Sequence, residues 1–251
     1  MLEAIKEIVG ESRFFTADAI GADYCHDECP GVAGTPDAAA EVTSTEQAAA
    51  VVKLCAEAGV PVTVRGAGTG QAGGSVPVSG GVVLSLKAMD QILEFDEAAR
   101  TLRVQPGVLL QEVKAEAEKR GLYYPPDPGE KTATIGGNAA TNASGPNAVK
   151  YGTTRDYVAA LTVVRADGST ETLSGADLES VIGSEGTLAV ITELTLKLID
   201  KPKADAILLF PFMDTETCLN AANALLAKDY APAVVEYMDT DIVEFSGNVT
   251  G

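Results

Sequence analysis

The 251-residue sequence predicts an α+β protein, on three observations. Segments with helical spacing alternate with short runs of β-branched residues along the chain. Hydrophobic residues make up 46% of the sequence, which is enough for a core, and glycines gather in a few loops. Acidic residues outnumber basic ones by 36 to 18, which argues against nucleic-acid binding. No apolar run reaches about 18 residues, so no transmembrane segment is expected.

The first third predicts two helices and two strands. Residues 1–11 have amphipathic spacing, without the basic start and long apolar run of a signal peptide, so we expect a cytoplasmic protein. Capping pairs within residues 43–47 predict a second helix, which Gly59 ends. Strands are expected at 60–64 and 82–86, with a glycine loop between them.

The middle of the chain predicts antiparallel strands and one helix. The helix contains Leu109, Leu110 and Val113 and ends at Gly121. Asp167-Gly168 is a strong hairpin signal. The expected strands are 92–96 paired with 101–105, 157–165 paired with 170–173, and the half-buried strand 188–198.

Residues 201–251 predict a single β-α-β unit. Strands are expected at 207–212 and 234–238, on either side of a helix at 215–228. A unit this small cannot bury both faces of its sheet, so we interpret it as the beginning of a further α/β domain.

The four cysteines predict no disulfide framework and no metal site. Cys55 and Cys218 fall on helical segments and are interpreted as core thiols. Cys25 and Cys29 flank His26, the only histidine, in a spacing that matches no common zinc pattern. An ordinary loop is therefore expected there.

Three glycine-rich loops, at 65–75, 134–145 and 183–187, predict a nucleotide ligand. Glycine lets backbone N–H groups approach an anion closely, so even an acidic chain can bind a pyrophosphate. Ordinary turns are the alternative for any single loop. Gln71 stands where a dinucleotide-binding Rossmann loop has its third glycine, and no Gly-Lys-Ser/Thr occurs, so neither an NAD nor an ATP loop is favoured.

Five motifs in one order resemble the FAD-binding domain of the vanillyl-alcohol-oxidase/PCMH superfamily. They lie at 65–74, 125–129, 135–138, 150–152 and 183–188, and the likeness is greatest to the branch of glycolate oxidase FAD-linked subunits and D-lactate dehydrogenases. The resemblance implies a PCMH-type fold of two α+β subdomains, 1–86 and 87–200, with FAD between them. A truncated α/β cap domain for the substrate follows over 201–251.

The resemblance also implies which residues hold FAD. Because the first loop has no histidine or cysteine that could tether the flavin, FAD is expected to be non-covalent. Arg65 could add a charge or support the loop. The implied cofactor residues are Arg65, Gly66, Ala67, Gly68, Thr69, Gly70, Gly74, Ser75, Pro126, Asp127, Pro128, Gly129, Thr134, Ile135, Gly136, Gly137, Asn138, Asn142, Gly145, Tyr151, Gly152, Glu185, Gly186 and Ile191.

The function implied is that of a FAD-dependent oxidoreductase, or its FAD-binding half. It would oxidise a 2-hydroxy acid such as D-lactate or glycolate by hydride transfer to flavin N5 and pass electrons to oxygen, a quinone or an electron-transfer flavoprotein. The alternative is a non-catalytic FAD-carrying electron-transfer module that needs a partner chain. The family's histidine-rich motifs would lie beyond residue 251, so the chain alone is expected to be inactive, and no catalytic base is assigned.

Overall fold

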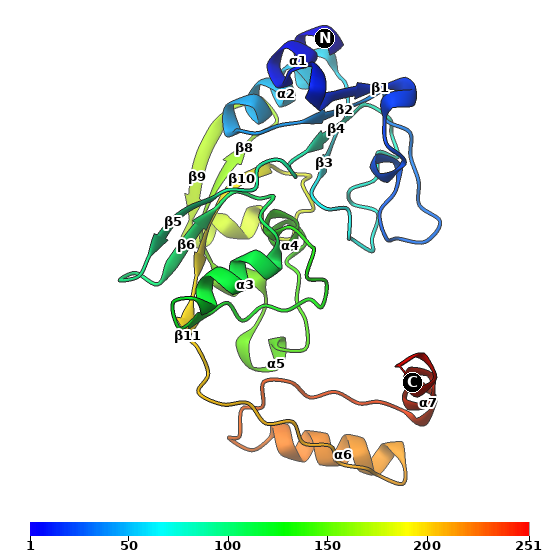
Figure 1. Cartoon of the computed structure of the whole chain (residues 1–251), viewed down its shortest axis with the longest axis vertical. Helices are drawn as coiled ribbons and strands as arrows, with labels where there is room; N and C mark the ends of the chain where they lie inside the picture. The colour runs from blue at the N-terminus through cyan, green and yellow to red at the C-terminus, as the bar shows by residue number, and fades with distance from the viewer. Residues whose placement is uncertain (251) are drawn as a thin grey trace.

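Two β-sheets organise the body of the protein, shown in Figure 1, and the computed structural model describes residues 1–250. The α+β class predicted from the sequence is confirmed, because helices pack against both sheets. Among the described residues, every helix is too short or too polar to cross a membrane.

The first sheet is mixed, with strands in the order β1-β2-β4-β3. Strands β2, β4 and β3 run parallel, and β1 is antiparallel at the edge. Helices α1 (Leu2–Val9) and α2 (Thr45–Ala58) share a buried core with this sheet, and Cys55 lies in that core as predicted. The strands are β1 (Phe14–Thr16), β2 (Ala38–Glu41), β3 (Val62–Arg65) and β4 (Val82–Ser85).

Helix α2 begins and ends where its sequence signals predict. The Ser44 hydroxyl accepts a hydrogen bond from the Gln47 amide at 3.3 Å. Gly59 ends the helix with φ +66°, a left-handed conformation in which glycine has no Cβ penalty. Strand β3 starts after Pro61, later than predicted, because proline has no N–H to donate to a neighbouring strand.

The second sheet is antiparallel throughout, in the order β5-β6-β10-β8-β9. Both predicted hairpins are present, and Gly168 has φ +82° in the turn of the second. The strands are β5 (Ile92–Asp96), β6 (Thr101–Val104), β8 (Val158–Val164), β9 (Thr170–Ser174) and β10 (Val190–Lys197).

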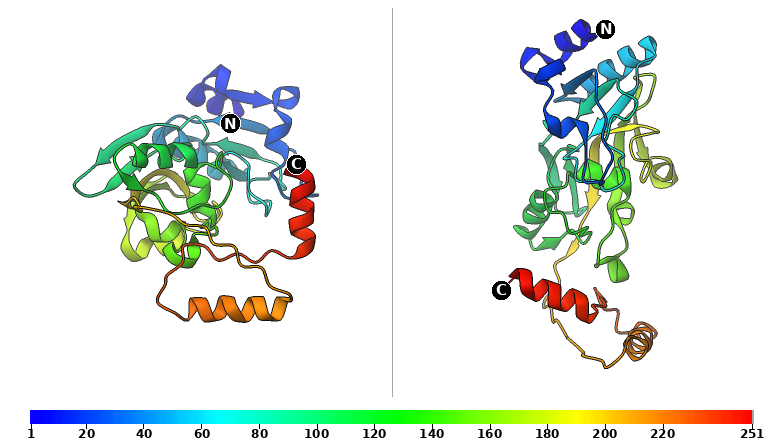
Figure 2. Two further views of the ribbon diagram at one scale, coloured as in Figure 1. Left: turned by 60° about the horizontal axis from the view of Figure 1, so that its bottom comes forward. Right: turned by 90° about the vertical axis from the view of Figure 1, so that its right-hand side faces the viewer.

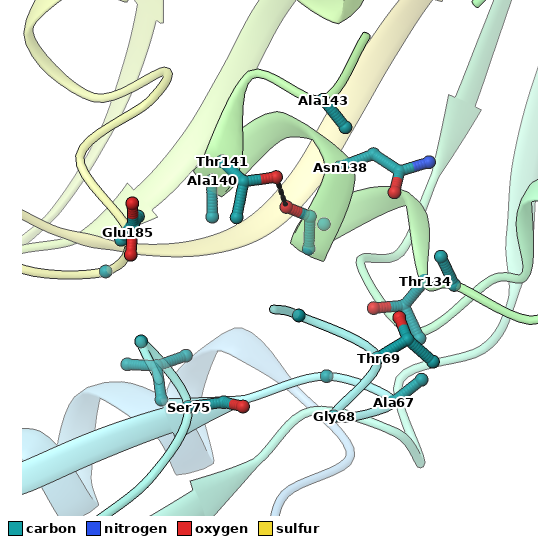
Figure 3. Close-up of a pocket in the computed structure, with 18 of the residues that line it drawn as sticks. Ala67, Gly68, Thr69, Ser75, Thr134, Asn138, Ala140, Thr141, Ala143 and Glu185 are labelled. Carbon is teal, nitrogen blue, oxygen red and sulfur yellow. Dashed lines mark hydrogen bonds between the residues drawn. The ribbon is translucent and has the colours of Figure 1, made fainter. Parts of the chain in front are cut away.

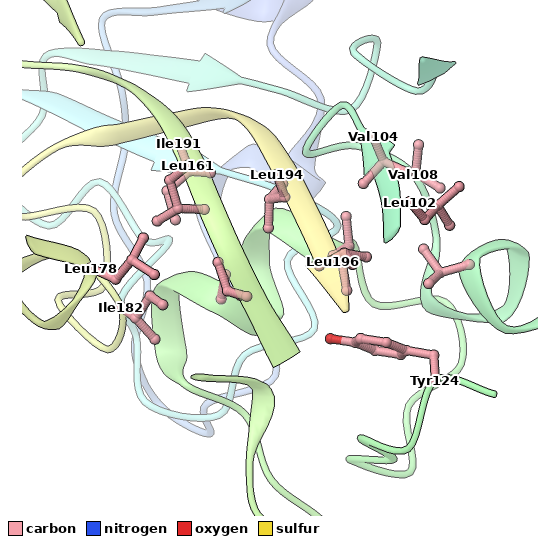
Figure 4. Close-up of a cluster of buried hydrophobic side chains, with 14 of the residues drawn as sticks. Leu102, Val104, Val108, Tyr124, Leu161, Leu178, Ile182, Ile191, Leu194 and Leu196 are labelled. Atoms are coloured by element: carbon pink, nitrogen blue, oxygen red, sulfur yellow. The ribbon is translucent and has the colours of Figure 1, made fainter. Parts of the chain in front are cut away.

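Helices α3 (Leu110–Glu118) and α4 (Ile135–Thr141) cover the second sheet and bury its core. Figure 4 shows side chains of β6, β8 and β10 in this core beside the ring of Tyr124, which is fully buried. The remaining elements are β7 (Leu122–Tyr123), which pairs with β11 (Ile199–Asp200), helices α5 (Ala148–Tyr151), α6 (Thr215–Leu226) and α7 (Thr240–Thr250), and 3-10 turns at Glu11–Arg13, Ala17–Ala19, Ala22–Cys25, Thr154–Tyr157 and Gly175–Ser180.

The two sheets are joined through α2. This helix contacts β8 and β10, and Val164 and Val190 belong to the core of the first sheet. A Cβ on Gly168 would stand 2.7 Å from the Lys53 Cβ, so the hairpin turn packs directly against the helix. The loops of both sheets are therefore held at a fixed separation. We propose that the subdomain boundaries lie after residues 86 and 200, outside every strand of these two sheets.

Part of the second glycine-rich stretch is a helix, where the sequence predicted a loop. Ile135 and Ala139 are four residues apart and both fully buried against the second sheet, which favours helix despite two glycines. A Cβ on Gly136 would overlap Pro106, so only glycine lets this helix approach so closely.

The predicted strands 207–212 and 234–238 are wrong. Neither segment pairs with a neighbour among residues 1–250, and a strand without a partner leaves its backbone groups unsatisfied. Only the helix between them forms, as α6. Figures 1 and 2 show this part of the chain extending away from the two-sheet body, with Ile207 97% and Met213 100% exposed. Cys218 is half-buried on α6, so it is not the core thiol that its helix predicted.

Candidate cofactor site

A cavity of about 300 Å³ lies between the loops of the two sheets. This volume is at the lower end of the usual range for ligand pockets, roughly 300–1,000 Å³. The loop after β3 forms one side, α4 and its flanks form the opposite side, and Glu185-Gly186 closes one end, as Figure 3 shows. Val64 of β3 and Ile191 of β10 complete the wall from the two sheets.

The structure brings together residues from all three predicted glycine-rich segments. They are separated by up to 120 positions in the sequence, from Gly66 to Gly186, and meet in this one cavity. Those of the predicted cofactor residues that line it are Gly66, Ala67, Gly68, Thr69, Gly70, Gly74, Ser75, Pro128, Thr134, Gly136, Gly137, Asn138, Glu185, Gly186 and Ile191.

The first glycine loop touches the opposite wall at both of its ends. A Cβ on Gly66 would overlap the Thr134 hydroxyl, and a Cβ on Gly74 would stand 2.6 Å from the Glu185 carboxylate. Glycine at residue 66 therefore lets the loop pack against the buried Thr134, whereas the Glu185 carboxylate beside Gly74 ends a flexible, exposed side chain that can move. Glu185 itself has φ +53°, and its amide donates to the Ala140 carbonyl at 2.8 Å, which fixes the loop against α4.

Arg65 supports the first glycine loop from behind and does not line the cavity. Its Nη1 donates to the His26 carbonyl at 2.8 Å and lies 3.4 Å from the Ser75 hydroxyl. The guanidinium is 4% exposed, and this burial lowers its pKa below the ordinary value, while the charges of Asp23 and Asp27 oppose the shift. Gly68, with φ +78°, leaves room for the guanidinium, because a Cβ there would overlap it.

Several other predicted residues lie outside the cavity lining and organise the chain around it. Asn142 ends α4 with φ +48°, and its Oδ1 accepts from the Thr153 hydroxyl and the Arg155 amide, both at 3.0 Å. Gly145 lets the chain pass the Asp127 carbonyl, which a Cβ would overlap. Their assignment as cofactor contacts stays a prediction.

The rest of the predicted set outside the lining is also accounted for by local contacts. Ile135 is buried in the core of the second sheet, beneath the cavity. The Asp127 carboxylate pairs with Lys114 at 2.9 Å, within the turn that holds Pro126 and Gly129. Tyr151 packs edge-on against Tyr123, with ring centroids 6.1 Å apart, and Gly152 has φ +80° beside it. Contact of these residues with a cofactor also remains a prediction.

Sequence reasoning missed about half of the cavity wall. Ala140, Thr141 and Ala143 lie in the second glycine-rich stretch, and a helical interpretation would have found the first two, three or four residues after Gly137. Asp27 carried no signal, because its loop was expected to be ordinary. The missed lining residues are Asp27, Val64, Gln71, Ala72, Leu86, Pro106, Glu130, Ala133, Ala140, Thr141, Ala143 and Ala189.

The lining offers hydrogen bonds and no positive side chain. Within residues 1–250, its charged members are Asp27, Glu130 and Glu185, all acidic. The Asn138 side chain is 4% exposed, and its Nδ2 finds no hydrogen-bond partner within that part of the chain, so a buried donor is left over in the wall. A ligand with phosphate or hydroxyl oxygens fits this site, because neutral amides and glycine backbone can bind it without clashing side chains.

Comparison with known proteins decides the family. Residues 36–174 match the FAD binding domain family, and this match spans more than half of the chain. The chain belongs to this family. FAD is therefore its cofactor, and the resemblance inferred from the five motifs is confirmed. The glycines that line the cavity of this FAD binding domain, and the buried Asn138 Nδ2 donor, fit that cofactor.

Named relatives with similar sequences include a D-lactate dehydrogenase and a glycolate oxidase subunit. The chain is 47% identical over 254 residues to D-lactate dehydrogenase of Anaerostipes hadrus, covering 97% of this chain and 53% of the relative. It is 37% identical over 247 residues to glycolate oxidase subunit GlcD of Bacillus subtilis, covering 94% and 53%. The chain thus spans about half the length of the curated relatives it matches.

Solved structures share the fold. Alkyldihydroxyacetonephosphate synthase aligns with a TM-score of 0.72 at 24% identity, over 81% of this chain and 39% of that one. 6-Hydroxy-D-nicotine oxidase of Arthrobacter nicotinovorans aligns with a TM-score of 0.63 at 25% identity, over 76% and 42%. The PCMH-type α+β fold predicted from the sequence is therefore confirmed.

Proposed function

We propose that this chain is the FAD-binding part of an oxidoreductase that oxidises a 2-hydroxy acid such as D-lactate or glycolate. The observation that carries the proposal is the cavity in which the three glycine-rich segments meet, in a chain 47% identical to a D-lactate dehydrogenase. When bound, FAD supplies the acceptor for a hydride at its N5.

The chain's own residues bind and orient the cofactor in this proposal. Backbone amides of the loop 66–75 hold its phosphates, with Thr69 and Ser75 as neutral partners. Asn138 donates its free Nδ2 hydrogens from the opposite wall. No histidine, cysteine or tyrosine of the described chain lines the cavity, so the flavin is held without a covalent bond.

Substrate binding needs groups that the cavity wall does not supply. A 2-hydroxy acid carries a carboxylate that calls for a cation, and its hydroxyl proton needs a base within hydrogen-bond reach. Among residues 1–250 the wall contains neither lysine, arginine nor histidine. This favours an arrangement in which residues 201–251 belong to a cap domain, and the cap domain supplies the cation and the base that the substrate needs. The electrons then pass to an electron-transfer flavoprotein or another redox partner.

The lack of substrate-binding groups in the cavity wall also fits a second function. In that case the chain is a FAD-carrying electron-transfer module that works with a partner chain. Anaerobic mixing of the FAD-loaded protein with D-lactate, and with L-lactate as the matched control, separates the two. A longer protein that contains this chain should bleach with D-lactate and not with L-lactate, whereas the 251-residue chain should bleach with neither. Failure of the longer protein to bleach with D-lactate, glycolate or D-2-hydroxyglutarate would favour the module.

A cytoplasmic location also belongs to the proposal. All four cysteines are free thiols, as is usual for proteins of a reducing compartment. Cell fractionation with antibodies against the chain tests the location, and recovery outside the cytoplasmic fraction would contradict it.

A further inference from the structure

Asp27 is a buried carboxylate in the wall of a cavity that binds an anionic cofactor. Its side chain is 6% exposed, and it lies in the loop between the 3-10 turn Ala22–Cys25 and β2. It also precedes residue 36, where the match to the FAD binding domain family begins. A negative charge beside phosphates opposes their binding. A carboxylate at this position must therefore contribute to the site in another way.

The contacts of Asp27 tie its own turn together. Its Oδ1 accepts a hydrogen bond from the Cys29 amide at 2.9 Å. Its Oδ2 lies 3.5 Å from the Ser75 hydroxyl and faces Gly70, where a Cβ would stand 3.6 Å away. The carboxylate thus joins the turn 26–29 to the end of the first glycine loop.

Backbone groups of residues 26–29 also hold the first glycine loop in place. The Glu28 amide donates to the Gly70 carbonyl at 2.9 Å, in the middle of the loop. The His26 carbonyl accepts from Arg65 Nη1 at 2.8 Å, where the loop begins. The start, the middle and the end of the loop are therefore all fixed to a turn that Asp27 closes.

A glycine-rich loop loses much conformational entropy when a ligand orders it, so fixing the loop beforehand strengthens binding. We propose that Asp27 is a positioning residue of the FAD site, which holds the loop 66–75 in its binding shape through the turn 26–29 and Ser75. The inference rests on the proposal that this loop binds the phosphates of FAD.

Two variants of Asp27 separate positioning from charge. Asp27→Asn removes the charge but keeps an oxygen that can accept from the Cys29 amide, whereas Asp27→Ala removes both. If Asp27 acted only as a charge, both variants would bind FAD more tightly, by the same factor. If Asp27 positions the loop, Asp27→Ala should raise the dissociation constant for FAD about tenfold. Asp27→Asn should keep this constant within about threefold of that of the unaltered chain. Asp18→Asn, at an exposed position in the 3-10 turn Ala17–Ala19, is the matched charge control.

The experiment titrates the flavin-free 251-residue chain and the three variants with FAD, following flavin fluorescence, and records phosphorus NMR of the bound cofactor. The phosphate signals should shift in Asp27→Ala while the visible flavin band stays unchanged. A dissociation constant and phosphate shifts in Asp27→Ala equal to those of Asp18→Asn would overturn the inference. No FAD binding by the unaltered chain would overturn the proposed function as well.

Folding of each variant is checked by thermal unfolding. If Asp27→Ala does not fold, backbone hydrogen exchange over residues 66–75 is compared between Asp27→Asn and Asp18→Asn. The inference expects faster exchange in Asp27→Asn, because an asparagine that keeps its oxygen on the Cys29 amide presents an NH2 group to the Ser75 hydroxyl in place of the carboxylate oxygen that accepts from it. Equal exchange would overturn it.

Discussion

The Thr134 hydroxyl lies against the backbone of Gly66, so close that a Cβ at residue 66 would overlap it. These residues come from the two opposite sides of the cavity, one from the loop after β3 and the other from the residue before α4. Their contact sets the separation of the two walls at this end of the cavity.

Gly66→Ala should therefore push the walls apart and weaken FAD binding. Overpacking by one methyl group commonly costs about 1–3 kcal/mol, which corresponds to roughly five- to 150-fold in the dissociation constant. Thr134→Ala in the same chain should restore part of the loss, because the new Cβ would then lie 3.5 Å from the Cβ of residue 134, an ordinary contact. Fluorescence titration of the two single variants and the double variant measures this coupling. Strictly additive effects would show that the two residues do not set the width of the cavity.

Two glycines of the cavity wall should respond differently to alanine. Gly68 has φ +78°, and its Cβ would overlap the buried Arg65 guanidinium, so Gly68→Ala should lower the melting temperature of the flavin-free protein. At Gly137 the nearest atom is the Thr134 hydroxyl, at 3.2 Å, and φ is not positive, so Gly137→Ala should fold nearly normally.

Both of these variants should still bind less FAD. In Gly137→Ala the methyl group is added to a residue of the cavity wall, and in Gly68→Ala the displaced Arg65 guanidinium disturbs the loop that it supports. Calorimetry and flavin stoichiometry on the same preparations test the pair. Equal melting temperatures for the two variants would contradict the supporting position given to Arg65.

Replacement of Asn138 should move stability and binding in opposite directions. Its Nδ2 is a buried donor without a hydrogen-bond partner among residues 1–250, and such a group costs about 1–3 kcal/mol. Asn138→Leu should thus raise the free energy of unfolding of the flavin-free protein, yet weaken FAD binding by removing the donor. Denaturant unfolding and FAD titration provide the two values, with Asn220→Leu on the exposed face of α6 as the control. Loss of stability with unchanged FAD affinity would contradict the assignment.

Much of the body could be predicted because its signals are local. Ser44 and Gly59 mark the ends of α2, and Asp167-Gly168 marks a hairpin turn, so neither depends on the rest of the chain. The cavity was found through its glycines, since motif order and glycine spacing are visible in the sequence. The proposal that it is the FAD site depended on the ordered motifs together, because each loop alone has the composition of a turn.

What the sequence could not predict depends on contacts between distant residues. The helix α4 forms across two glycines because Ile135 and Ala139 pack on the second sheet, and this packing overrides propensity. Asp27 reaches the cavity only through the fold of its loop. The apolar runs 207–212 and 234–238 have strand composition but no neighbouring strand among the described residues, and composition alone does not supply hydrogen-bond partners.

Flavin content of the purified 251-residue chain tests the central claim most directly. The protein should show the absorption bands of an oxidised flavin, with close to one FAD per chain after saturation. Acid precipitation should leave the flavin in the supernatant as intact FAD, because the cavity wall offers no histidine, cysteine or tyrosine among residues 1–250 to bond it. Protein that stays colourless after incubation with excess FAD, or flavin that precipitates with the polypeptide, would contradict this account.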